Sequence, residues 1–181
     1  LRRGARSVLF LEGGGATGRG IAYGTRWGSH LLNVRASNMS ALPDDPGHFV
    51  RFAGAAPDGF VPRTRYGEYV EFVLDEARNL AVPGVAFQRT RDAVTDVIVT
   101  RDGVTLTGAS GLRYACDAAV LATGFFPRSR WPGLPGAISN PWAAGALESV
   151  PLDAPVLVLG TGLTMVDVAL ALEDRGFRSQ F

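Results

Sequence analysis

The sequence predicts an α/β protein: a Rossmann-like dinucleotide-binding domain that carries a helical insertion and a β-meander, followed by the start of a second Rossmann unit. Three observations support this fold class. A short apolar run, Ser7–Glu12, ends in an acidic residue. Between residues 85 and 122 the chain contains strand-like segments separated by short turns. Near the C-terminal end, an apolar run leads into a glycine-rich turn and then into a helical pattern.

The composition limits the size and the partners of the protein. The chain has 181 residues, of which 46% are hydrophobic, which is enough for one domain with a core but short for two complete dinucleotide-binding domains. A net charge of +1 gives no reason to expect nucleic acid or an anionic membrane as a partner. No apolar run reaches the roughly 18–20 residues of a membrane span. The single cysteine, Cys116, excludes an internal disulfide and fits a reducing cytoplasm, which is the predicted location.

The first predicted element is a buried strand over Ser7–Glu12, because a short, uninterrupted apolar run is typical of a strand covered on both faces. A loop is expected from Gly13 to Gly24. A helix is predicted to begin near Asp45, whose carboxylate is a candidate N-cap, and Pro46 fits the first helical turn.

A second helix is predicted over residues 65–80, with Thr64 as a candidate N-cap. Apolar residues recur along it at spacings of three and four, the pattern of an amphipathic helix. They are Tyr66, Tyr69, Val70, Val73, Leu74 and Ala77. Tyr66 and Tyr69 share one face and are expected in the core.

Successive strands are expected in the segment that follows. They are Val85–Arg89, Val94–Thr100, Val104–Thr107, Leu112–Ala115 and Ala118–Ala122. Arg101-Asp102-Gly103, between two of them, is a hairpin turn signal. Because the strands are joined by short turns and not by helices, they predict a β-meander and argue against alternating βαβ units in this part of the chain.

A second glycine-rich turn joins a predicted strand, Val156–Leu159, to a helix predicted from Leu163 to Arg175. In Gly160-Thr161-Gly162-Leu163-Thr164, the first glycine permits a tight turn and the second lets the backbone approach a pyrophosphate. The helix N-terminus then offers free N–H groups to the phosphates. Met165 stands where the usual fingerprint has a third glycine, so a turn that binds nothing is the alternative interpretation.

The string Gly13–Gly18 matches the pattern G-x-G-x-x-G literally, but it is not predicted to be a phosphate loop. The stretch after it contains three further glycines and shows no helical period. The strand before it ends in Glu12, where the second strand of a Rossmann unit places the acid that binds ribose hydroxyls. Glu12 is therefore the predicted ribose ligand, and an exposed acid at a strand end is the alternative.

A short internal repeat supports this assignment. Residues 175–179 match residues 3–7 at four of five positions. If the two units are superimposed on this repeat, the phosphate loop of the first unit falls before Leu1, and Glu12 follows its first glycine by about 24 residues, near the expected spacing. The chain is accordingly expected to be an internal fragment of a longer protein.

Several strings together resemble the FAD-NAD(P)-binding protein family, a group of bacterial flavoproteins related to flavin-containing and N-hydroxylating monooxygenases. They include Gly18-Arg-Gly20-Ile-Ala22-Tyr23-Gly24, His30-Leu-Leu-Asn33, Phe60-Val-Pro62-Arg63, Ala122-Thr123-Gly124 and Gly160–Asp167. The resemblance runs nearly from end to end. It implies an FAD-binding domain over residues 1–127 that lacks its first strand and phosphate loop. An inter-domain connection over residues 128–153 and the start of an NAD(P)-binding domain over residues 154–181 would follow.

The resemblance also implies roles in binding FAD. Glu12 would hold the adenosine ribose of FAD. Gly18, Gly20 and Asn33 would lie along the flavin end of the cofactor. The segment Ala122-Thr123-Gly124, at the end of the last predicted strand of the first domain, would close over the FAD.

For NAD(P)H, the resemblance implies that Gly160, Gly162, Leu163 and Thr164 cradle the pyrophosphate. Arg63 has two readings of equal weight: it binds a cofactor phosphate, or it pairs with an acid on the surface. His30 and His48 are each isolated in the sequence, so packed or solvated histidines are expected and not catalytic bases. No metal-binding cluster is predicted.

These features predict an FAD-dependent oxidoreductase that NAD(P)H reduces and that acts on a small molecule not specified by the sequence. No residue of this segment is predicted to be catalytic, because the cofactors carry the redox chemistry. Two alternatives remain. The first is a non-catalytic or degenerate nucleotide-binding fragment. The second is a single-Rossmann dehydrogenase or methyltransferase that uses only the Gly160 turn, and the run of strands before it argues against that reading.

Overall fold

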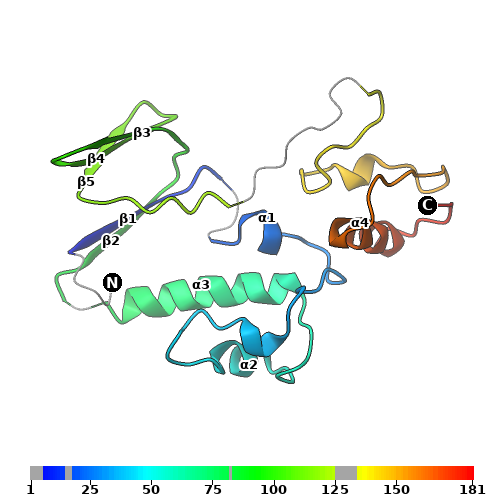
Figure 1. Ribbon diagram of the computed structural model, residues 1–181, viewed down its shortest axis with the longest axis horizontal. Helices are drawn as coiled ribbons and strands as arrows, with labels where there is room; N and C mark the ends of the chain where they lie inside the picture. The colour runs from blue at the N-terminus through cyan, green and yellow to red at the C-terminus, as the bar shows by residue number, and fades with distance from the viewer. Residues whose placement is uncertain (1–5, 15–17, 82, 125–133) are drawn as a thin grey trace. The chain divides into compact units, whose positions relative to one another are not determined.

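The structure is a computed structural model that describes residues 6–14, 18–81, 83–124 and 134–181. It is a mixed α/β protein with two small sheets, whose elements are labelled in Figure 1. The chain divides into two compact units. Unit 1 comprises Leu1–Gly20 and Val70–Gly124, and unit 2 comprises Ile21–Tyr69 and Phe125–Phe181. Residues 3–5 of the short repeat, residues 15–17 of the first glycine string and residues 128–133 of the predicted connection lie outside the described residues.

A parallel strand pair in unit 1 places the first acidic residue of interest. Strand β1 (Ser7–Leu11) pairs with β2 (Ala86–Thr90) in a register that aligns Leu11 with Thr90. The pairing continues one step beyond the strand, because the Glu12 N–H donates to the Thr90 carbonyl oxygen over 3.2 Å. The predicted first strand therefore forms, and Glu12 lies just past its carboxyl end, but the prediction that it is buried on both faces is wrong, because no residue of β1 is buried and Leu9 is 38% exposed.

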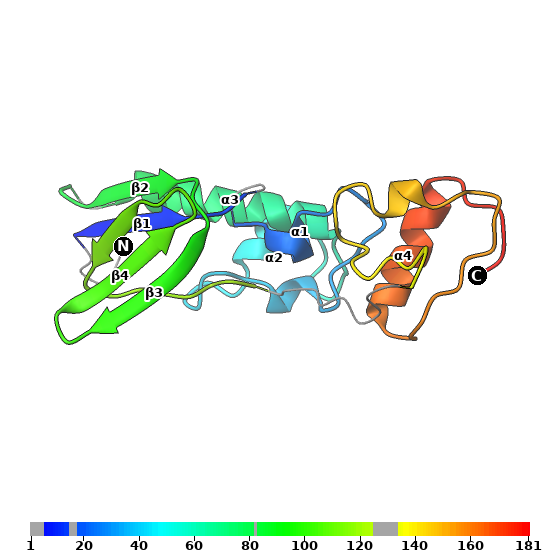
Figure 2. The ribbon, with the colours of Figure 1, turned by 90° about the horizontal axis from the view of Figure 1, so that it is seen from above.

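The predicted meander is also confirmed in unit 1. Strands β3 (Val94–Thr100), β4 (Gly103–Gly108) and β5 (Arg113–Cys116) form a three-stranded antiparallel sheet, seen side by side in Figure 2. The β3–β4 hairpin turns at Arg101 and Asp102, and Gly103, which pairs with Thr100 at the start of β4, has a φ of 142° that disfavours a residue with a side chain. Next to it, the Asp102 N–H donates to the Thr100 hydroxyl oxygen over 3.2 Å, as the predicted turn signal requires.

A buried carboxylate joins the loop before β3 to the end of the meander. Asp92 is 7% exposed and accepts hydrogen bonds from the Ser110 N–H (3.1 Å), the Ser110 hydroxyl (2.5 Å) and the Tyr114 hydroxyl (2.8 Å). These bonds, that of the Ser110 hydroxyl foremost, lower the pKa of Asp92. A Cβ atom added at Gly108 would lie 1.8 Å from Asp92 Oδ2, so the carboxylate fills the space that a side chain would take.

Gly108→Ala is expected to destabilise the meander by about 1–3 kcal/mol, because Asp92 cannot move aside without giving up its bonds to Ser110 and Tyr114. Urea unfolding followed by far-UV circular dichroism measures the loss. Gly28→Ala is the matched control, because a Cβ atom there would meet nothing within 4 Å. Equal stability of the two variants would show that the Asp92 carboxylate is free to relocate.

Unit 2 is built around aromatic side chains of two helices. Helix α2 (His48–Ala53) contributes Phe49, which is fully buried. Helix α3 (Arg63–Asn79) begins in unit 2 and contributes Tyr69, which is also fully buried, as predicted. The two ring centroids lie 5.0 Å apart, and the Tyr69 hydroxyl oxygen accepts a hydrogen bond from the Ala41 N–H (3.1 Å) and lies 2.9 Å from His48 Nδ1. The ring and the hydroxyl of Tyr69 thus join the two helices to the loop before α2.

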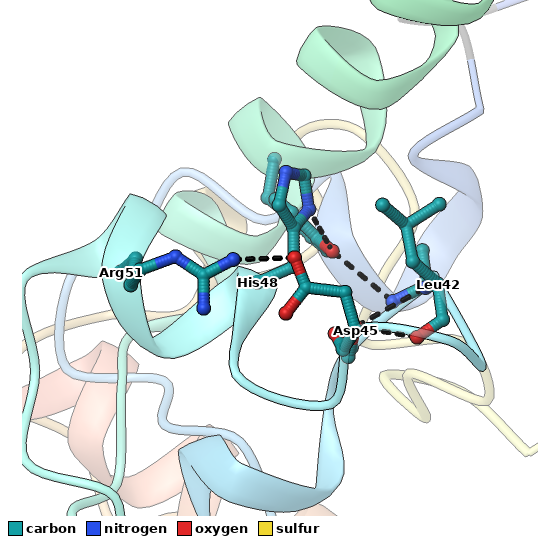
Figure 3. A network of polar contacts seen from close by, with 7 residues as sticks. Leu42, Asp45, His48 and Arg51 are labelled. Carbon is teal, nitrogen blue, oxygen red and sulfur yellow. Dashed lines mark hydrogen bonds and ion pairs between the residues drawn. The ribbon is translucent and has the colours of Figure 1, made fainter.

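Both predicted helix caps are wrong. Helix α2 begins at His48, and its N-cap is Gly47, which has no side chain with which to cap. The Asp45 carboxylate instead accepts a hydrogen bond from the Arg51 guanidinium one turn into the helix, which lowers the pKa of Asp45 (Figure 3). Helix α3 begins at Arg63, one residue before the predicted cap Thr64, which therefore lies inside the first turn.

Short helical turns also appear where a loop was predicted. Helix α1 (Gly20–Tyr23) lies in the segment expected to be irregular, and a 3-10 turn covers Ala36–Asn38. The Tyr23 ring packs on that of Tyr66, with centroids 4.5 Å apart. A tertiary contact of this kind stabilises a single helical turn that has no periodic pattern in the sequence.

The predicted C-terminal helix is confirmed as α4 (Leu163–Asp174) in unit 2. Its C-terminal half contributes Ala171 and Leu172 to a buried cluster, together with Leu147 from a 3-10 turn, Leu147–Ser149. Part of the segment expected to connect two domains therefore packs against α4. Among the helices of the described ranges, none combines the length and apolar character needed to cross a membrane.

Two predicted strands do not form in the described part of the chain. Residues 118–122 and 156–159 are extended without ladder partners, and Val120 and Leu157 are 92% and 83% exposed. The Val156 N–H donates to the Gln180 carbonyl oxygen over 3.0 Å, but no strand pairing extends from it among the described residues. An apolar run gives a segment strand propensity, whereas a strand also needs the N–H and C=O groups of a neighbour.

Candidate functional site

The candidate site in unit 1 is centred on Glu12. Its Oε1 accepts a hydrogen bond from the Gly18 N–H over 3.3 Å. Its Oε2 is buried and has no hydrogen-bond donor among the described residues, and the nearest cation is Arg89 Nη2 at 3.6 Å. The Glu12 side chain is only 19% exposed. Burying a carboxylate oxygen without a hydrogen-bond donor costs free energy of folding, so Oε2 has an unused capacity to accept a hydrogen bond.

The glycine pair predicted along the flavin end adjoins Glu12, because Gly18 donates the hydrogen bond to Oε1. Gly18 and Gly20 have φ angles of 70° and 55°, in the left-handed region that favours glycine. A Cβ atom at Gly18 would lie 3.0 Å from Val70 Cγ1 of α3, so a side chain would also be crowded there. Between the two glycines, Arg19 makes a bidentate ion pair with Glu71 of α3, with distances of 2.9 and 2.7 Å. The loop is thus held by the carboxylates of Glu12 and Glu71.

Glu71→Gln is expected to remove a pH-dependent part of the stability, worth at most about 1 kcal/mol because the pair is partly exposed. The hydrogen bond from Arg19 lowers the pKa of Glu71 below its ordinary value of 4.5. The stabilisation is therefore complete above pH 4.5 and is lost as the pH falls through the lower, folded-state pKa. Urea unfolding from pH 7 to pH 3 should show wild type and variant converging in acid.

The control for this prediction is Glu68→Gln. Glu68 pairs with Arg65 on the same helix, but both side chains are more exposed, at 47% and 43%. Its replacement should change the stability less than Glu71→Gln does at pH 7. A constant difference between wild type and Glu71→Gln across the pH range would contradict the role given to the Arg19 ion pair.

Arg89 was not identified from the sequence. It lies on β2, next to Glu12, because the parallel register brings the ends of β1 and β2 together. It also lines a hollow of about 260 Å³ with Phe87 of β2 and with α3 residues. The alternation of residues along β2 places Phe87 and Arg89 on one face. The alternation can be seen in the sequence, but it does not place Arg89 next to Glu12 until the pairing of β2 with β1 is known.

The other residues predicted to contact FAD lie apart from this carboxylate in the sequence and are exposed. Ala122, Thr123 and Gly124, in unit 1, belong to no strand, and Gly124 has a φ of 65° in the left-handed region. Asn33, in unit 2, is exposed in the loop that follows Leu32, whose N–H donates to the Val61 carbonyl oxygen over 2.9 Å. Their predicted roles remain expectations from the family resemblance.

The glycine turn predicted to hold NAD(P)H precedes α4 in unit 2. Gly160 has a φ of 117°, and Gly162 is the N-cap of the helix. Leu163 is 58% exposed and Thr164 is also exposed. Cβ atoms at Gly160 and Gly162 would meet nothing within 4 Å, so the backbone of this turn is open to an approaching ligand. The role of the turn in binding a pyrophosphate remains an expectation from the family resemblance.

Arg63, the remaining predicted site residue, pairs with an acid. Its Nη2 lies 2.9 Å from Asp167 Oδ2 of α4, and both side chains are largely buried, at 16% and 8% exposure. This is the ion-pair reading of Arg63, although the partner acid is buried and not on the surface. The sequence showed Asp167 only as the last residue of the second glycine motif, and its pairing depends on the packing of α4.

A carboxylate at the carboxyl end of a parallel strand, facing a glycine loop, is typical of a nucleotide-binding α/β protein. Residues 3–126 match the family described as FAD-NAD(P)-binding. Because this match covers more than half of the sequence, the chain belongs to the FAD-NAD(P)-binding family.

The chain is also similar to two solved structures. One is tetracycline destructase Tet(51), with a TM-score of 0.34, 14% identity and coverage of 64% of this chain and 37% of that one. The other is the Diels-Alderase PyrE3 of pyrroindomycin biosynthesis, with a TM-score of 0.30, 19% identity and coverage of 61% and 31%. The chain thus spans about a third of the length of each. No curated protein matches the sequence.

Proposed function

We propose that this chain is part of an FAD-dependent oxidoreductase reduced by NAD(P)H, and that unit 1 binds the adenosine ribose of FAD. The observation that carries the proposal is the buried Glu12 Oε2, which has no hydrogen-bond donor among the described residues. The family supports it, because the FAD-NAD(P)-binding match includes Glu12 and the glycine loop. A ribose has two vicinal hydroxyl donors, and a carboxylate is acceptor-only, so the two chemistries are complementary.

Within this proposal the residues of unit 1 bind and orient. Glu12 Oε2 accepts a hydrogen bond from a ribose hydroxyl while Oε1 keeps its bond to the Gly18 N–H. Arg89 Nη2, 3.6 Å from Oε2, places a positive charge beside the carboxylate. The Arg19–Glu71 pair fixes the glycine loop against α3. FAD, when bound, supplies the redox chemistry by accepting a hydride.

The nicotinamide side of the proposal rests on the turn Gly160–Thr164. Residues Gly160–Thr164 are exposed, and the positive end of the dipole of α4 favours a pyrophosphate there. The substrate that would receive electrons is a small molecule.

A second candidate is a nucleotide-binding module without catalysis. Segments 118–122 and 156–159 favour it, because neither belongs to a strand in the described part of the chain and both would flank cofactor-binding turns in the oxidoreductase. This candidate shares the Glu12 site and predicts binding of the adenosine part of the cofactor without reduction.

The test is an anaerobic visible spectrum of the purified protein after incubation with FAD and removal of the excess, before and after addition of NADPH or NADH. Retention of the yellow flavin band, followed by bleaching with one nucleotide, supports the oxidoreductase and identifies the electron donor. Retention without bleaching supports the binding module. ADP-ribose, which carries the same ribose, should compete with FAD. A folded protein that retains no FAD and binds no ADP-ribose contradicts both candidates.

A further inference from the structure

We infer that Arg63, Asp167 and His30 form a buried latch that positions the first turn of α4, and with it the turn Gly160–Thr164. All of these residues belong to unit 2. The inference rests on the proposed function, in which the turn receives the pyrophosphate of NAD(P)H. It assigns to Arg63 a positioning role in place of direct contact with a cofactor phosphate.

The ion pair of the latch is fixed on several sides. Arg63 Nη2 lies 2.9 Å from Asp167 Oδ2, and Arg63 Nε donates to the Leu31 carbonyl oxygen over 2.9 Å. The guanidinium also lies 5.9 Å from the centre of the Trp142 ring. Two buried charges are tolerated only when their geometry is good and their remaining hydrogen-bonding groups have partners. Arg63 thus has a carboxylate and a main-chain carbonyl as its partners, which restricts the position of Asp167.

His30 holds the main chain of the same residue. The His30 side chain is fully buried, and its Nε2 lies 2.8 Å from the Asp167 carbonyl oxygen. A carbonyl oxygen only accepts, so Nε2 carries a proton. On the other side of the ring, Nδ1 lies 2.9 Å from Thr25 Oγ1, which in turn accepts a hydrogen bond from the Trp27 N–H. Asp167 is therefore held by its side chain and by its main chain at once.

The latch contacts the N-terminal half of α4, next to the turn Gly160–Thr164. Asp167 is the fifth residue of α4, one turn beyond the N-cap Gly162. The C-terminal half of the helix is held by the buried side chains of Ala171 and Leu172. The residues Gly160–Thr164 are exposed, and Cβ atoms at Gly160 and Gly162 would touch nothing. The polar contacts at Asp167 therefore orient the N-terminal half, and a phosphate is bound well only when the N–H groups already point at it.

The first measurement is hydrogen exchange of the peptide that covers residues 160–170, in the protein without nucleotide. Asp167→Asn should speed exchange there by about tenfold or more, because the first turn of α4 opens locally once the latch is broken. Asp174→Asn is the matched control. Asp174 is the last residue of the same helix and accepts a hydrogen bond from the Ser29 hydroxyl over 2.6 Å, so its loss should leave this peptide unchanged.

The second measurement is the equilibrium binding of NADPH and NADH to the same variants, beside the binding of FAD. Asp167→Asn should weaken binding of the preferred nicotinamide nucleotide by about tenfold, a loss of about 1.4 kcal/mol, and should leave FAD affinity unchanged. Arg63→Lys keeps the charge but loses the Nε donor to Leu31, so it should give smaller effects of the same kind. If near-UV circular dichroism shows that Asp167→Asn does not fold, hydrogen exchange and nucleotide binding are both measured on Arg63→Lys instead.

The two measurements separate the inference from the proposed function. Exchange in a folded Asp167→Asn or Arg63→Lys protein that equals the wild-type rate overturns the latch, whatever the protein binds. Faster exchange with unchanged NADPH and NADH affinity overturns the role of the latch in positioning a nucleotide. If the wild-type protein binds neither nucleotide, the nicotinamide half of the proposed function fails, and the exchange rates still decide whether the latch orients the helix.

Discussion

Glu12→Gln is expected to weaken FAD binding by about 10- to 100-fold, because a hydrogen bond to a charged group contributes about 1.5–3 kcal/mol. The glutamine amide has one acceptor oxygen and one NH₂ group, whereas the carboxylate accepts at both oxygens. If the amide oxygen keeps the bond to the Gly18 N–H, the NH₂ group takes the position of Oε2 and cannot accept a hydrogen bond from a ribose hydroxyl. Titration of the apoprotein with FAD, followed by the quenching of flavin fluorescence, measures the difference.

Asp102→Asn is the control for the Glu12 experiment. It removes one negative charge from unit 1 at the exposed tip of the β3–β4 hairpin, where the backbone N–H of residue 102 still donates to the Thr100 hydroxyl oxygen. FAD affinity should be unchanged in this variant. If Glu12→Gln binds FAD as tightly as wild type, Glu12 is not the ribose ligand and the unit 1 site must be placed elsewhere.

Tyr69→Ala is expected to destabilise unit 2 by about 3–5 kcal/mol, the range for truncating a large aromatic side chain in a core. Tyr69 is fully buried, with its ring centroid 5.0–5.5 Å from those of Phe49, Phe52, His48 and Tyr66. Since native proteins have a free energy of unfolding of only about 5–15 kcal/mol, this variant should lose much of its resistance to urea. The midpoint of the urea transition, followed by far-UV circular dichroism, gives the value.

Two further variants separate the ring of Tyr69 from its hydroxyl. Tyr69→Phe keeps the ring but leaves the Ala41 N–H without its acceptor, so it should cost about 1–3 kcal/mol. Phe72→Ala, on the same helix, removes a ring that is 39% exposed and should be better tolerated than Tyr69→Ala. A Tyr69→Ala protein as stable as Phe72→Ala would contradict the placement of Tyr69 at the centre of the aromatic cluster.

Elements that satisfy their own hydrogen bonds locally could be predicted from the sequence. The β3–β4 hairpin contains its turn and both of its strands within 15 residues, Val94–Gly108, so propensity and turn chemistry act together. Helix α4 follows from the apolar residues and the glycine turn before it. The segments 118–122 and 156–159 have equal strand propensity, but a ladder is formed with a partner distant in the sequence, which a local pattern does not reveal.

The same distinction between local signals and tertiary contacts applies to the residues of the candidate site. Glu12 could be identified because its position at the end of an apolar run is itself a local signal. Arg89 and Asp167 could not, since each meets its partner only through tertiary structure: Arg89 through the parallel register of β1 and β2, and Asp167 through the packing of α4. The failed Asp45 cap has a related cause, because the Arg51 guanidinium competes for the carboxylate that would otherwise cap the helix.

The division into two units has a consequence for spectroscopy. The three tryptophans are Trp27, Trp131 and Trp142, and none falls within the sequence ranges of unit 1. Tyr114 is the one tyrosine within those ranges. Indole emission excited at long wavelength therefore reports on unit 2 alone, whereas backbone ellipticity reports on both. Recording the two signals in one unfolding experiment would show directly whether the units melt as a single cooperative block or one after the other.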